Sequence, residues 1–352
     1  MPSPRVVSVS IMLAALAAAP AFAAPSGDDP LLEKGQAAFR KGDVAGALAA
    51  FDEAAKVDPK DARPHYLRGV ALEKKGDAAG AAEAYRQAIA RKGDFPEAHN
   101  NLGTLLLAKG DAARAATELE AAVKARPDYG EAQYNLGVAR DALGKRPEAV
   151  AAYKEAARLR PNDAAARLNL GAALRRVGDV AGARAALTDA TRLAPADAVA
   201  WADLGMILSD AKELDPAQAA LEKATKLKPD FALAWDRLGR VELRRGRFPE
   251  AVAAGARARE LEPKNAGFAA DVCRATFELR QPDRAVAACR AAVDLDPQNP
   301  LARYELTKAF VAQGDCKAAR AEIDRFKKLA GIKPQAVAQA DGIVATCKPA
   351  AK

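Results

Sequence analysis

The chain repeats itself every 34 residues, and this period constrains its fold more than any other feature. Residues 96–129 read PEAHNNLGTLLLAKGDAARAATELEAAVKARPDY, and the same pattern returns in residues 130–163 and 164–197. Each copy reads as two helices joined by a short turn. A sustained period of this length indicates a stacked array in which every unit buries its apolar side against the next. The 352 residues therefore do not predict several globular domains, because such an array grows by adding units and not by enlarging one core.

The copies share small, large and turn residues at fixed places. In residues 96–129 these are Leu102, Gly103, Gly110, Ala115, Leu119, Ala122 and Pro127. Gly103 lets two helices approach closely, Gly110 suits the positive φ at a helix end, and Pro127 cannot continue a helix interior. The pattern resembles the tetratricopeptide repeat (TPR) family, from about Asp28 to Lys333. This resemblance implies an all-α, right-handed superhelix of about nine helix–turn–helix repeats, with the first helix of each repeat lining a concave groove.

We expect the following segments along the chain. A leader covers 1–23 and a lead-in linker 24–27, a final capping helix covers 334–347, and a tail covers 348–352. The repeats between them are 28–61, 62–95, 96–129, 130–163, 164–197, 198–231, 232–265, 266–299 and 300–333. The last two depart most from the pattern: Cys273 and Cys289 replace the glycine and the large residue of the eighth repeat.

The first 23 residues have the composition of a secretory signal peptide. Arg5 precedes the apolar run Val6–Pro20, and Ala21–Ala23 gives the small–x–small pattern of a cleavage site. A membrane anchor is the alternative, but the run is shorter than the ~20 apolar residues that a span needs. We therefore expect cleavage after Ala23 and a periplasmic or secreted protein, without a membrane span in the mature chain. The leader style and the Ala- and Arg-rich composition favour a bacterial source.

The charges do not indicate a nucleic-acid partner. The formal net charge is +8 and the isoelectric point about 9.3, but both signs are spread through every repeat, as on solvated helix faces. An exported location also argues against nucleic acid. Attraction to acidic partners or anionic surfaces is compatible with the positive balance.

The sequence offers little chemistry for catalysis, so we expect a protein that is not an enzyme and has no cofactor. His65 and His99 lie one period apart, which could place a metal pair on adjacent helices. Trp201 and Trp235 occupy the equivalent position in later repeats, which favours a packing role for the histidines. No HExxH motif, phosphate-binding glycine loop or serine nucleophile elbow occurs.

The four cysteines lie in the last 80 residues of an apparently exported chain, and an even number there suggests disulfides. Cys273 and Cys289 occupy the close-contact positions of one repeat. Cys316 begins the second helix of the ninth repeat, and Cys347 ends the capping helix. We predict the pairs Cys273–Cys289 and Cys316–Cys347, with buried free thiols as the alternative.

By analogy with the TPR family, the groove is lined by the second, fifth, sixth, ninth, twelfth and thirteenth residues of each repeat. At the sixth position, Asn101, Asn135 and Asn169 resemble part of the asparagine ladder of O-linked N-acetylglucosamine transferase, which pairs side-chain amides with an extended peptide backbone. An amide offers both donor and acceptor, as a peptide unit requires. The alternative is that these are ordinary solvated helix residues. Tyr66, Tyr134 and Leu168 lie beside them at the fifth position.

Five arginines also fall on the expected groove face: Arg175, Arg176, Arg240, Arg244 and Arg274. Guanidinium groups bind carboxylates with two parallel hydrogen bonds, so they suit an acidic segment of a partner. The resemblance as a whole implies a scaffold or adaptor that binds proteins or extended peptides, in envelope complex assembly. The alternative is a self-associating structural spacer of the cell envelope, and the sequence leaves the oligomeric state open.

Overall fold

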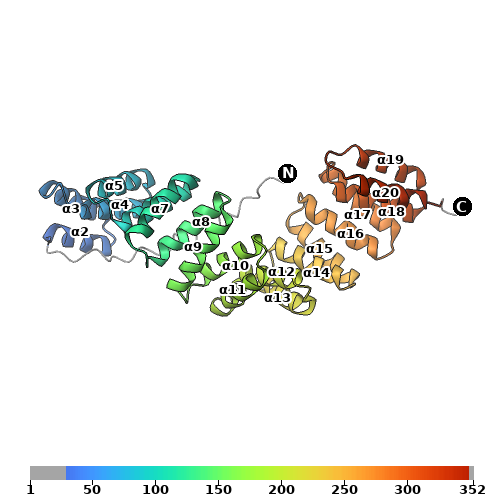
Figure 1. The fold of residues 1–352 in the computed structure, drawn as a ribbon, viewed down its shortest axis with the longest axis horizontal. Helices are drawn as coiled ribbons and strands as arrows, with labels where there is room; N and C mark the ends of the chain where they lie inside the picture. Colours follow the sequence, from blue (N-terminus) through green and yellow to red (C-terminus); the bar gives the residue numbers. More distant parts are fainter. Residues whose placement is uncertain (1–28, 349–352) are drawn as a thin grey trace. The chain divides into compact units, whose positions relative to one another are not determined.

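The computed structural model describes residues 29–348, and every regular element in that range is an α-helix, which confirms the all-α prediction (Figure 1). The expected signal peptide, the lead-in and most of the tail lie outside the described residues. The first helices of the repeats are α2 (Pro30–Arg40), α4 (Arg63–Lys75), α6 (Pro96–Ala108), α8 (Gly130–Ala142), α10 (Ala164–Arg176), α12 (Ala198–Asp210), α14 (Ala232–Arg244), α16 (Ala266–Glu278) and α18 (Pro300–Gln313). The second helices are α3 (Val44–Val57), α5 (Ala78–Arg91), α7 (Ala112–Ala125), α9 (Arg146–Leu159), α11 (Val180–Leu193), α13 (Leu214–Leu227), α15 (Phe248–Leu261), α17 (Pro282–Leu295) and α19 (Cys316–Lys327), and α20 (Pro334–Ala345) follows.

The chain divides into two compact units between Val177 and Gly178, within the turn of the fifth repeat. In each unit a helix packs on the next one along the chain, and first helices of neighbouring repeats also touch, as α6 does α8 and α14 does α16. The 34-residue period thus becomes a stack in which corresponding residues of neighbouring repeats lie near one another. The exact repeat boundaries stay a prediction.

The Gly-Asp pairs form the turn between the two helices of a repeat. Gly110 has φ +79°, which a residue with a Cβ rarely adopts, and ends the turn that follows α6. Asp111 then accepts a hydrogen bond from the backbone N–H of Arg114 at 3.0 Å and caps α7. Asp43, Asp77, Asp179 and Asp315 cap their helices in the same way. These carboxylates are therefore accounted for by the fold.

A glycine on the first helix packs against a large side chain on the second helix of the same repeat. A Cβ added to Gly103 would lie 2.6 Å from Cγ of Leu119, so only glycine fits against the fully buried leucine. The same contact joins Gly69 to Tyr85 and Gly137 to Tyr153. This contact defines the distance between the two helices and is the centre of each repeat's core.

The eighth repeat replaces this contact with a covalent bond. Cys273 and Cys289 occupy the glycine and large positions, and their Cα atoms are 4.6 Å apart in a disulfide. A second disulfide joins Cys316, at the start of α19, to Cys347, just after α20. These are the two pairs that the sequence predicts. Helix α20 packs on α18 and α19, where it covers Ile323 and Phe326.

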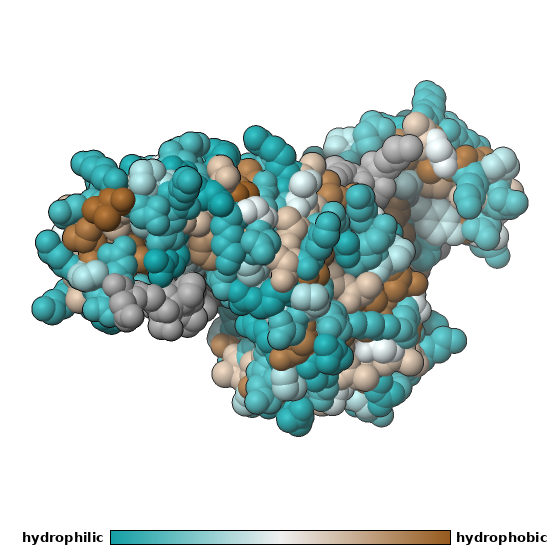
Figure 2. Space-filling model, turned by 60° about the vertical axis from the view of Figure 1, so that its left-hand side comes forward, coloured by the Kyte–Doolittle hydropathy of each residue, from teal (hydrophilic) through white to brown (hydrophobic). Residues whose placement is uncertain are grey.

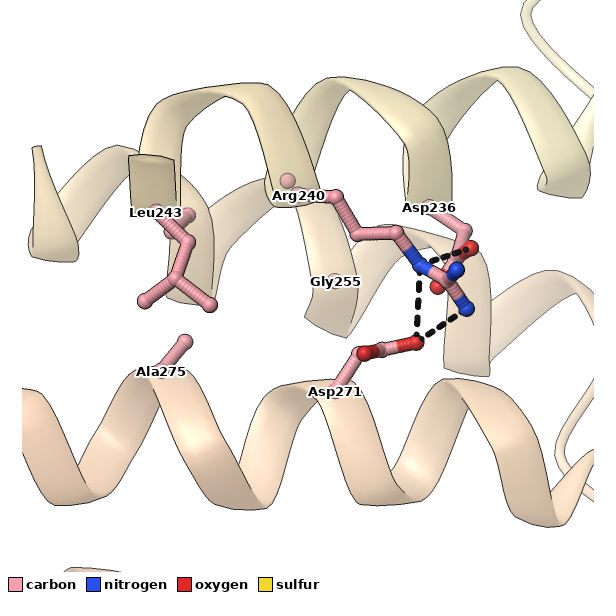
Figure 3. A pocket seen from close by; sticks show the side chains of 8 residues that line it. Asp236, Arg240, Leu243, Gly255, Asp271 and Ala275 are labelled. Atoms are coloured by element: carbon pink, nitrogen blue, oxygen red, sulfur yellow. Dashed lines mark hydrogen bonds and ion pairs between the residues drawn. The ribbon is translucent and has the colours of Figure 1, made fainter. Parts of the chain in front are cut away.

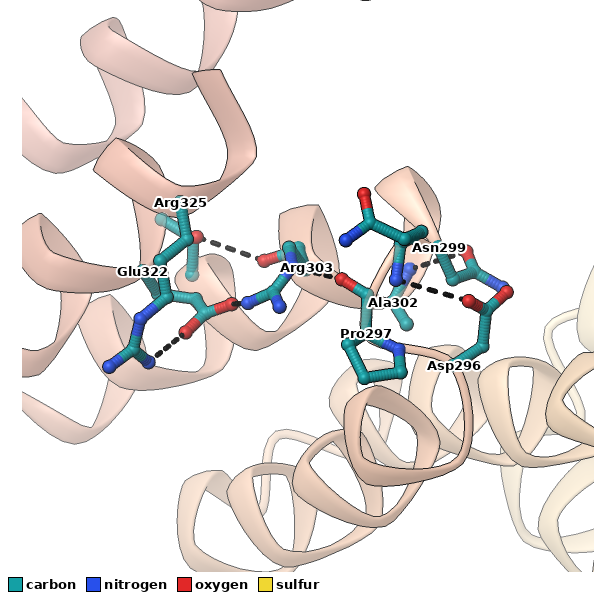
Figure 4. A network of polar contacts seen from close by, with 9 residues as sticks. Asp296, Pro297, Asn299, Ala302, Arg303, Glu322 and Arg325 are labelled. Atoms are coloured by element: carbon teal, nitrogen blue, oxygen red, sulfur yellow. Dashed lines mark hydrogen bonds and ion pairs between the residues drawn. The ribbon is translucent and has the colours of Figure 1, made fainter. Parts of the chain in front are cut away.

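In four repeats, the fourth residue ties the first helix back to the preceding turn. Trp201 and Trp235 each donate from Nε1 to the carbonyl oxygen of a proline six residues earlier, at 3.0 Å. Nε2 of His99 lies 3.0 Å from the carbonyl oxygen of Gly93, and Nε of Arg303 donates to that of Pro297 at 2.7 Å (Figure 4). Arg303 also pairs with buried Glu322, which binds Arg325 at 2.9 Å. Tryptophan, histidine and arginine thus make the same structural contact at one repeat position.

Candidate protein-interaction surface

In the first unit, the polar residues of α4, α6 and α8 form a chain of hydrogen bonds that links three repeats. Asn135 Nδ2 donates to Asn100 Oδ1 at 2.9 Å, and Asn100 Nδ2 donates to Asn101 Oδ1 at 3.3 Å. Asn101 Nδ2 in turn donates to the Tyr85 hydroxyl at 3.2 Å. Tyr85 hydrogen-bonds to Glu73 on α4. The repeats are stacked, so the Asn135 amide reaches Asn100 on the first helix of the preceding repeat, next to the equivalent residue Asn101.

The asparagine rank is therefore less open than the sequence predicts. Asn101 is 8% exposed and Asn135 5%, whereas Asn169 is half-buried. Asn169 Nδ2 donates to the Tyr134 hydroxyl at 2.8 Å. Both hydrogen-bonding ends of Asn101 are engaged, while the Oδ1 atoms of Asn135 and Asn169 accept no hydrogen bond from the described residues. Neither oxygen belongs to the fully buried polar atoms without a partner, so each keeps some contact with solvent, and this contact is small for Asn135.

The expected groove residues Tyr66, Tyr134 and Leu168 are all buried, which corrects the expectation that the fifth position is exposed. The Tyr66 ring lies 4.9 Å from that of Phe95 and 5.8 Å from that of Tyr85. The Tyr134 ring lies 5.9 Å from that of Tyr153. These rings face the second helices of their own repeats, so their main role is packing, with the hydroxyl of Tyr134 directed to Asn169.

Glu73 lies at the end of the hydrogen-bond chain, and nothing in the sequence pattern had marked it as a candidate. Burial raises its pKa to about 7, although the hydrogen bond from Tyr85 opposes this shift. Burial also raises the pKa of the Tyr85 phenol, so Tyr85 keeps its proton and serves as the donor to Glu73. The first unit thus holds a carboxyl that titrates near neutral pH within a buried network.

The expected arginines are separated, and most are paired within the protein. Arg176 is exposed and binds Asp141 of the preceding repeat at 2.5 Å, whereas Arg175 is half-buried. In the second unit, Arg244 donates to the carbonyl oxygen and hydroxyl of Ser209 at 2.9 and 2.7 Å. Arg274 is exposed without an ion pair in the described part of the chain. The arginines therefore do not form one free cluster for an acidic segment.

Arg240 completes a compact site between α14, α15 and α16 that the sequence alone did not predict. Its guanidinium binds Asp271 at 2.6 Å and Asp236 at 3.1 Å (Figure 3). Asp236 is 2% exposed, and its Oδ1 has no hydrogen-bond partner. Burial raises the pKa of Asp236 to about 7; Arg240 and Arg237 oppose this shift, and Asp271 adds to it. The only hint in the sequence was a charged residue at a fifth position that is mostly apolar or amide elsewhere.

The histidines do not come together at a metal site. His65 Nδ1 lies 3.1 Å from Gln87 Oε1, and His99 Nδ1 lies 2.7 Å from Glu118 Oε2. Burial lowers the pKa of His65; for His99, burial also acts to lower the pKa, but hydrogen bonds to Glu118 and the Gly93 carbonyl raise it overall. Among the described residues, no group of three or more histidine, cysteine or acidic side chains could hold a metal ion.

The rest of the surface is largely polar. Figure 2 shows hydrophilic residues over most of the visible face, with hydrophobic residues scattered among them. The exposed large apolar side chains of residues 29–348 are spread along the chain, although Val177 lies near Val180 and Leu295 near Leu301; the others are Val57, Leu143 and Leu227. Within the same range, no helix combines the length and the apolar character that a membrane crossing requires.

Three family models match the chain. The model described as "Cilia and flagella-associated protein 70 C-terminal domain" matches residues 129–342, more than half of the chain. Two models described as "Tetratricopeptide repeat" match residues 32–99 and 72–140. The comparison with curated proteins finds no match.

Solved structures with the same architecture include a chain of the "APC/C hetero-tetramer Cut9-Hcn1", with a TM-score of 0.55 and 19% identity over 80% of this chain. The match covers 56% of that chain, so this protein spans little more than half of its length. YrrB, described as "a TPR protein with an unusual peptide-binding site", matches with a TM-score of 0.50 and 25% identity, over 53% of this chain and 97% of that one. PilF of Pseudomonas aeruginosa has a TM-score of 0.50 and 20% identity, over 56% and 90% of the two chains. Since the family models and the helix–turn–helix units agree, the chain belongs to the tetratricopeptide repeat family.

Proposed function

We propose that this protein is a non-enzymatic scaffold or adaptor that binds partner proteins or extended peptides along the face formed by the first helices of its repeats. The TPR array is the architecture of a protein-interaction scaffold. The similarity to YrrB, a TPR protein with a peptide-binding site, supports the peptide mode.

One observation carries this proposal: two hydrogen-bond acceptors stand one repeat apart on that face. The Oδ1 atoms of Asn135 and Asn169 are free within the described chain and reach solvent. The amide of Asn169 also keeps one N–H, because only one of its two is used by Tyr134. An extended peptide has N–H groups to donate along its length, so these two oxygens suit its backbone and place no demand on its side chains.

Export to the envelope is part of the same proposal. The apolar run before Ala23 and the two disulfides support it, because disulfides persist in oxidising compartments. In a Gram-negative host, the protein in the periplasmic fraction should have the mass of a chain that begins at Ala24. Full-length protein retained in the cytoplasm would contradict the export proposal without bearing on peptide binding.

Selection from a library of displayed random peptides tests the binding function. We expect extended peptides to be enriched, and Asn135→Ala/Asn169→Ala to weaken their binding about tenfold, since two hydrogen bonds of ~0.5–1.5 kcal/mol each are lost. Asn101→Ala is the matched control, because the Asn101 amide is already engaged at both ends. Far-UV circular dichroism would show that both variants fold.

Equal peptide affinity of the wild type and the Asn135/Asn169 double variant would rule out this binding face. Light scattering distinguishes the other candidate, a self-associating spacer. A particle several times the 36.9 kDa chain mass, together with no enriched peptide, would favour the spacer.

A further inference from the structure

The second unit contains a small pocket, which α14, α15 and α16 line in the seventh and eighth repeats. Leu243 and Ala275 lie on one side of it, and Asp236, Arg240 and Asp271 lie on the other (Figure 3). Its interior has room for about one water molecule, and it is partly open to solvent. One wall is therefore apolar and the other charged.

The pocket exists because the seventh repeat lacks the large residue of its core contact. Gly255 occupies the position that holds Leu221 in the sixth repeat and Cys289 in the eighth. A Cβ added to Gly255 would lie 2.7 Å from Cγ2 of Val272, and Gly239 faces the backbone of Ala251 and Gly255. The glycines bring α14 and α15 close together, and Val272 of α16 takes the space next to Gly255. The pocket remains beside Leu243.

The charges around the pocket do not balance. In the neighbouring repeats, Asp203 pairs with Arg237 at 2.7 Å, and Glu305 pairs with Lys308 at 2.7 Å. At the pocket, Asp236 and Asp271 share the guanidinium of Arg240. Arg237, the other cation near Asp236, is already paired with Asp203. In the neighbouring repeats each of these carboxylates has its own cation, whereas the two carboxylates at the pocket have one cation between them.

Asp236 carries the unmatched charge. It is 2% exposed, and its Oδ1 accepts no hydrogen bond, although a buried carboxylate normally has a partner at each oxygen. Its hydrogen bond with Asp271 requires a proton on one of the two carboxyls, so it is absent when both are ionised. Two carboxylates are too few for a metal site, and no larger group of metal ligands exists among the described residues. A single positive charge with hydrogen-bond donors would match the ionised Asp236.

We propose that this pocket binds the ammonium end of a lysine side chain from the partner, between Asp236 and Asp271, with Leu243 and Ala275 beside the methylene group next to it. Arg240 is 55% exposed at its side chain, so it can turn outward on Asp271 and admit a second cation. A compact ammonium group suits the small volume better than a planar guanidinium. With the lysine bound, two cations face the two carboxylates. The lysine belongs to the partner proposed above, so this proposal rests on the scaffold function.

A small amine tests the pocket without any knowledge of the partner. The full chain, labelled with ¹³C at the aspartate carboxyls, is titrated with n-butylammonium and with the neutral n-butanol at pH 8, where Asp236 is ionised. We expect saturable shifts with the ammonium, at least tenfold weaker binding of the alcohol, and at least tenfold weaker ammonium binding at pH 5. Asp236→Asn should abolish the response, and Asp203→Asn, whose carboxylate is already paired one to one, should keep it.

The absence of a saturable response, or an equal response in Asp236→Asn, would overturn the proposal and leave the pocket to an ordered water. The two functions can fail separately. If butylammonium binds but no peptide is selected, the proposed peptide function is wrong and the pocket stands. If selected peptides bind equally well with lysine replaced by norleucine, and butylammonium does not bind, the pocket proposal is wrong and the scaffold function stands.

Discussion

Replacing Asp236 by asparagine should stabilise the second unit at pH 8 and have little effect at pH 4. Burial raises the pKa of Asp236 from 3.8 to about 7, so the folded protein holds this proton over a pH range in which the unfolded chain releases it. The cost of the buried charge is absent below about pH 4, grows as the pH rises, and is complete above pH 7. Asparagine keeps the shape of the side chain and has no charge to bury.

The structure sets the size of the effect. A shift of about three pKa units corresponds to about 4 kcal/mol, at ~1.36 kcal/mol per unit. The groups that face Asp236 are Arg237 and Arg240 on its own helix and Asp271 on α16, whereas α15 contributes only Ala251 and Gly255 to the pocket. The Arg240 side chain can turn toward the Asp236 carboxylate when it is ionised, and it keeps Asp271 as a partner in the variant. We therefore expect about half of the full value, ~2 kcal/mol, at pH 8.

Tryptophan fluorescence is a suitable assay, because the only two tryptophans of the sequence, Trp201 and Trp235, both lie in the second unit. Urea unfolding of wild type and Asp236→Asn at pH 4, 6 and 8 gives the difference in unfolding free energy at each pH. Asp203→Asn is the control with the opposite sign, since it leaves Arg237 without its partner. A difference that is the same at pH 4 and pH 8, or an Asp236→Asn variant less stable than wild type at pH 8, would refute the reasoning.

Three further variants test other parts of the fold. Tyr85→Phe removes the hydroxyl between Asn101 and Glu73 and should lower the free energy of unfolding by ~1–3 kcal/mol. Amide hydrogen exchange in α4 and α6 should then be faster. Unchanged exchange would mean that the hydrogen-bond chain adds no stability. Lys212 has φ +65° at a turn position where most repeats have glycine. Lys212→Gly should therefore stabilise the second unit by ~1 kcal/mol in the same urea assay. The reverse change at the equivalent position of the next repeat, Gly246→Lys, should destabilise it. Cys316→Ser/Cys347→Ser opens a loop of 31 residues, for which chain entropy predicts a loss of ~3–4 kcal/mol. Thermolysin, which cleaves before apolar residues, should therefore cut α20 first, and equal resistance of the variant would show that packing alone holds this helix.

The features that depend on one repeat alone were predictable from the sequence. The turn at Gly110, the cap at Asp111 and the contact of Gly103 with Leu119 are all local to 34 residues, and several other repeats contain the same features. The Cys273–Cys289 pair follows from the same rule, since these residues replace a glycine and a large residue that touch in other repeats. Repetition converts a weak local signal into a firm prediction.

Exposure on the first-helix face could not be read from one repeat, because it depends on the neighbours. Asn101 is buried since Tyr85 from the preceding repeat reaches its amide, and Asn169 is held by Tyr134 in the same manner. Position within a repeat says that a side chain points toward the groove, but the size of the adjacent side chains decides whether it reaches solvent. The family analogy therefore predicts on which face of the helix a side chain lies, but not how deeply the side chain is buried.

The ion pairs between repeats follow the period and could have been found from the sequence by pairing opposite charges about 34 residues apart. Arg237 binds Asp203 at a separation of 34, Arg176 binds Asp141 at 35, and Arg240 binds Asp271 at 31. A search of this kind leaves Asp236 without a partner of its own, since Arg240 is shared with Asp271 and Arg237 pairs with Asp203. In a stacked array, where neighbours are fixed by the period, an unmatched charge is visible as an exception to that period. Such exceptions are the positions at which a repeat protein departs from what its own stacking requires, so binding should be sought there before it is sought at the repeated residues.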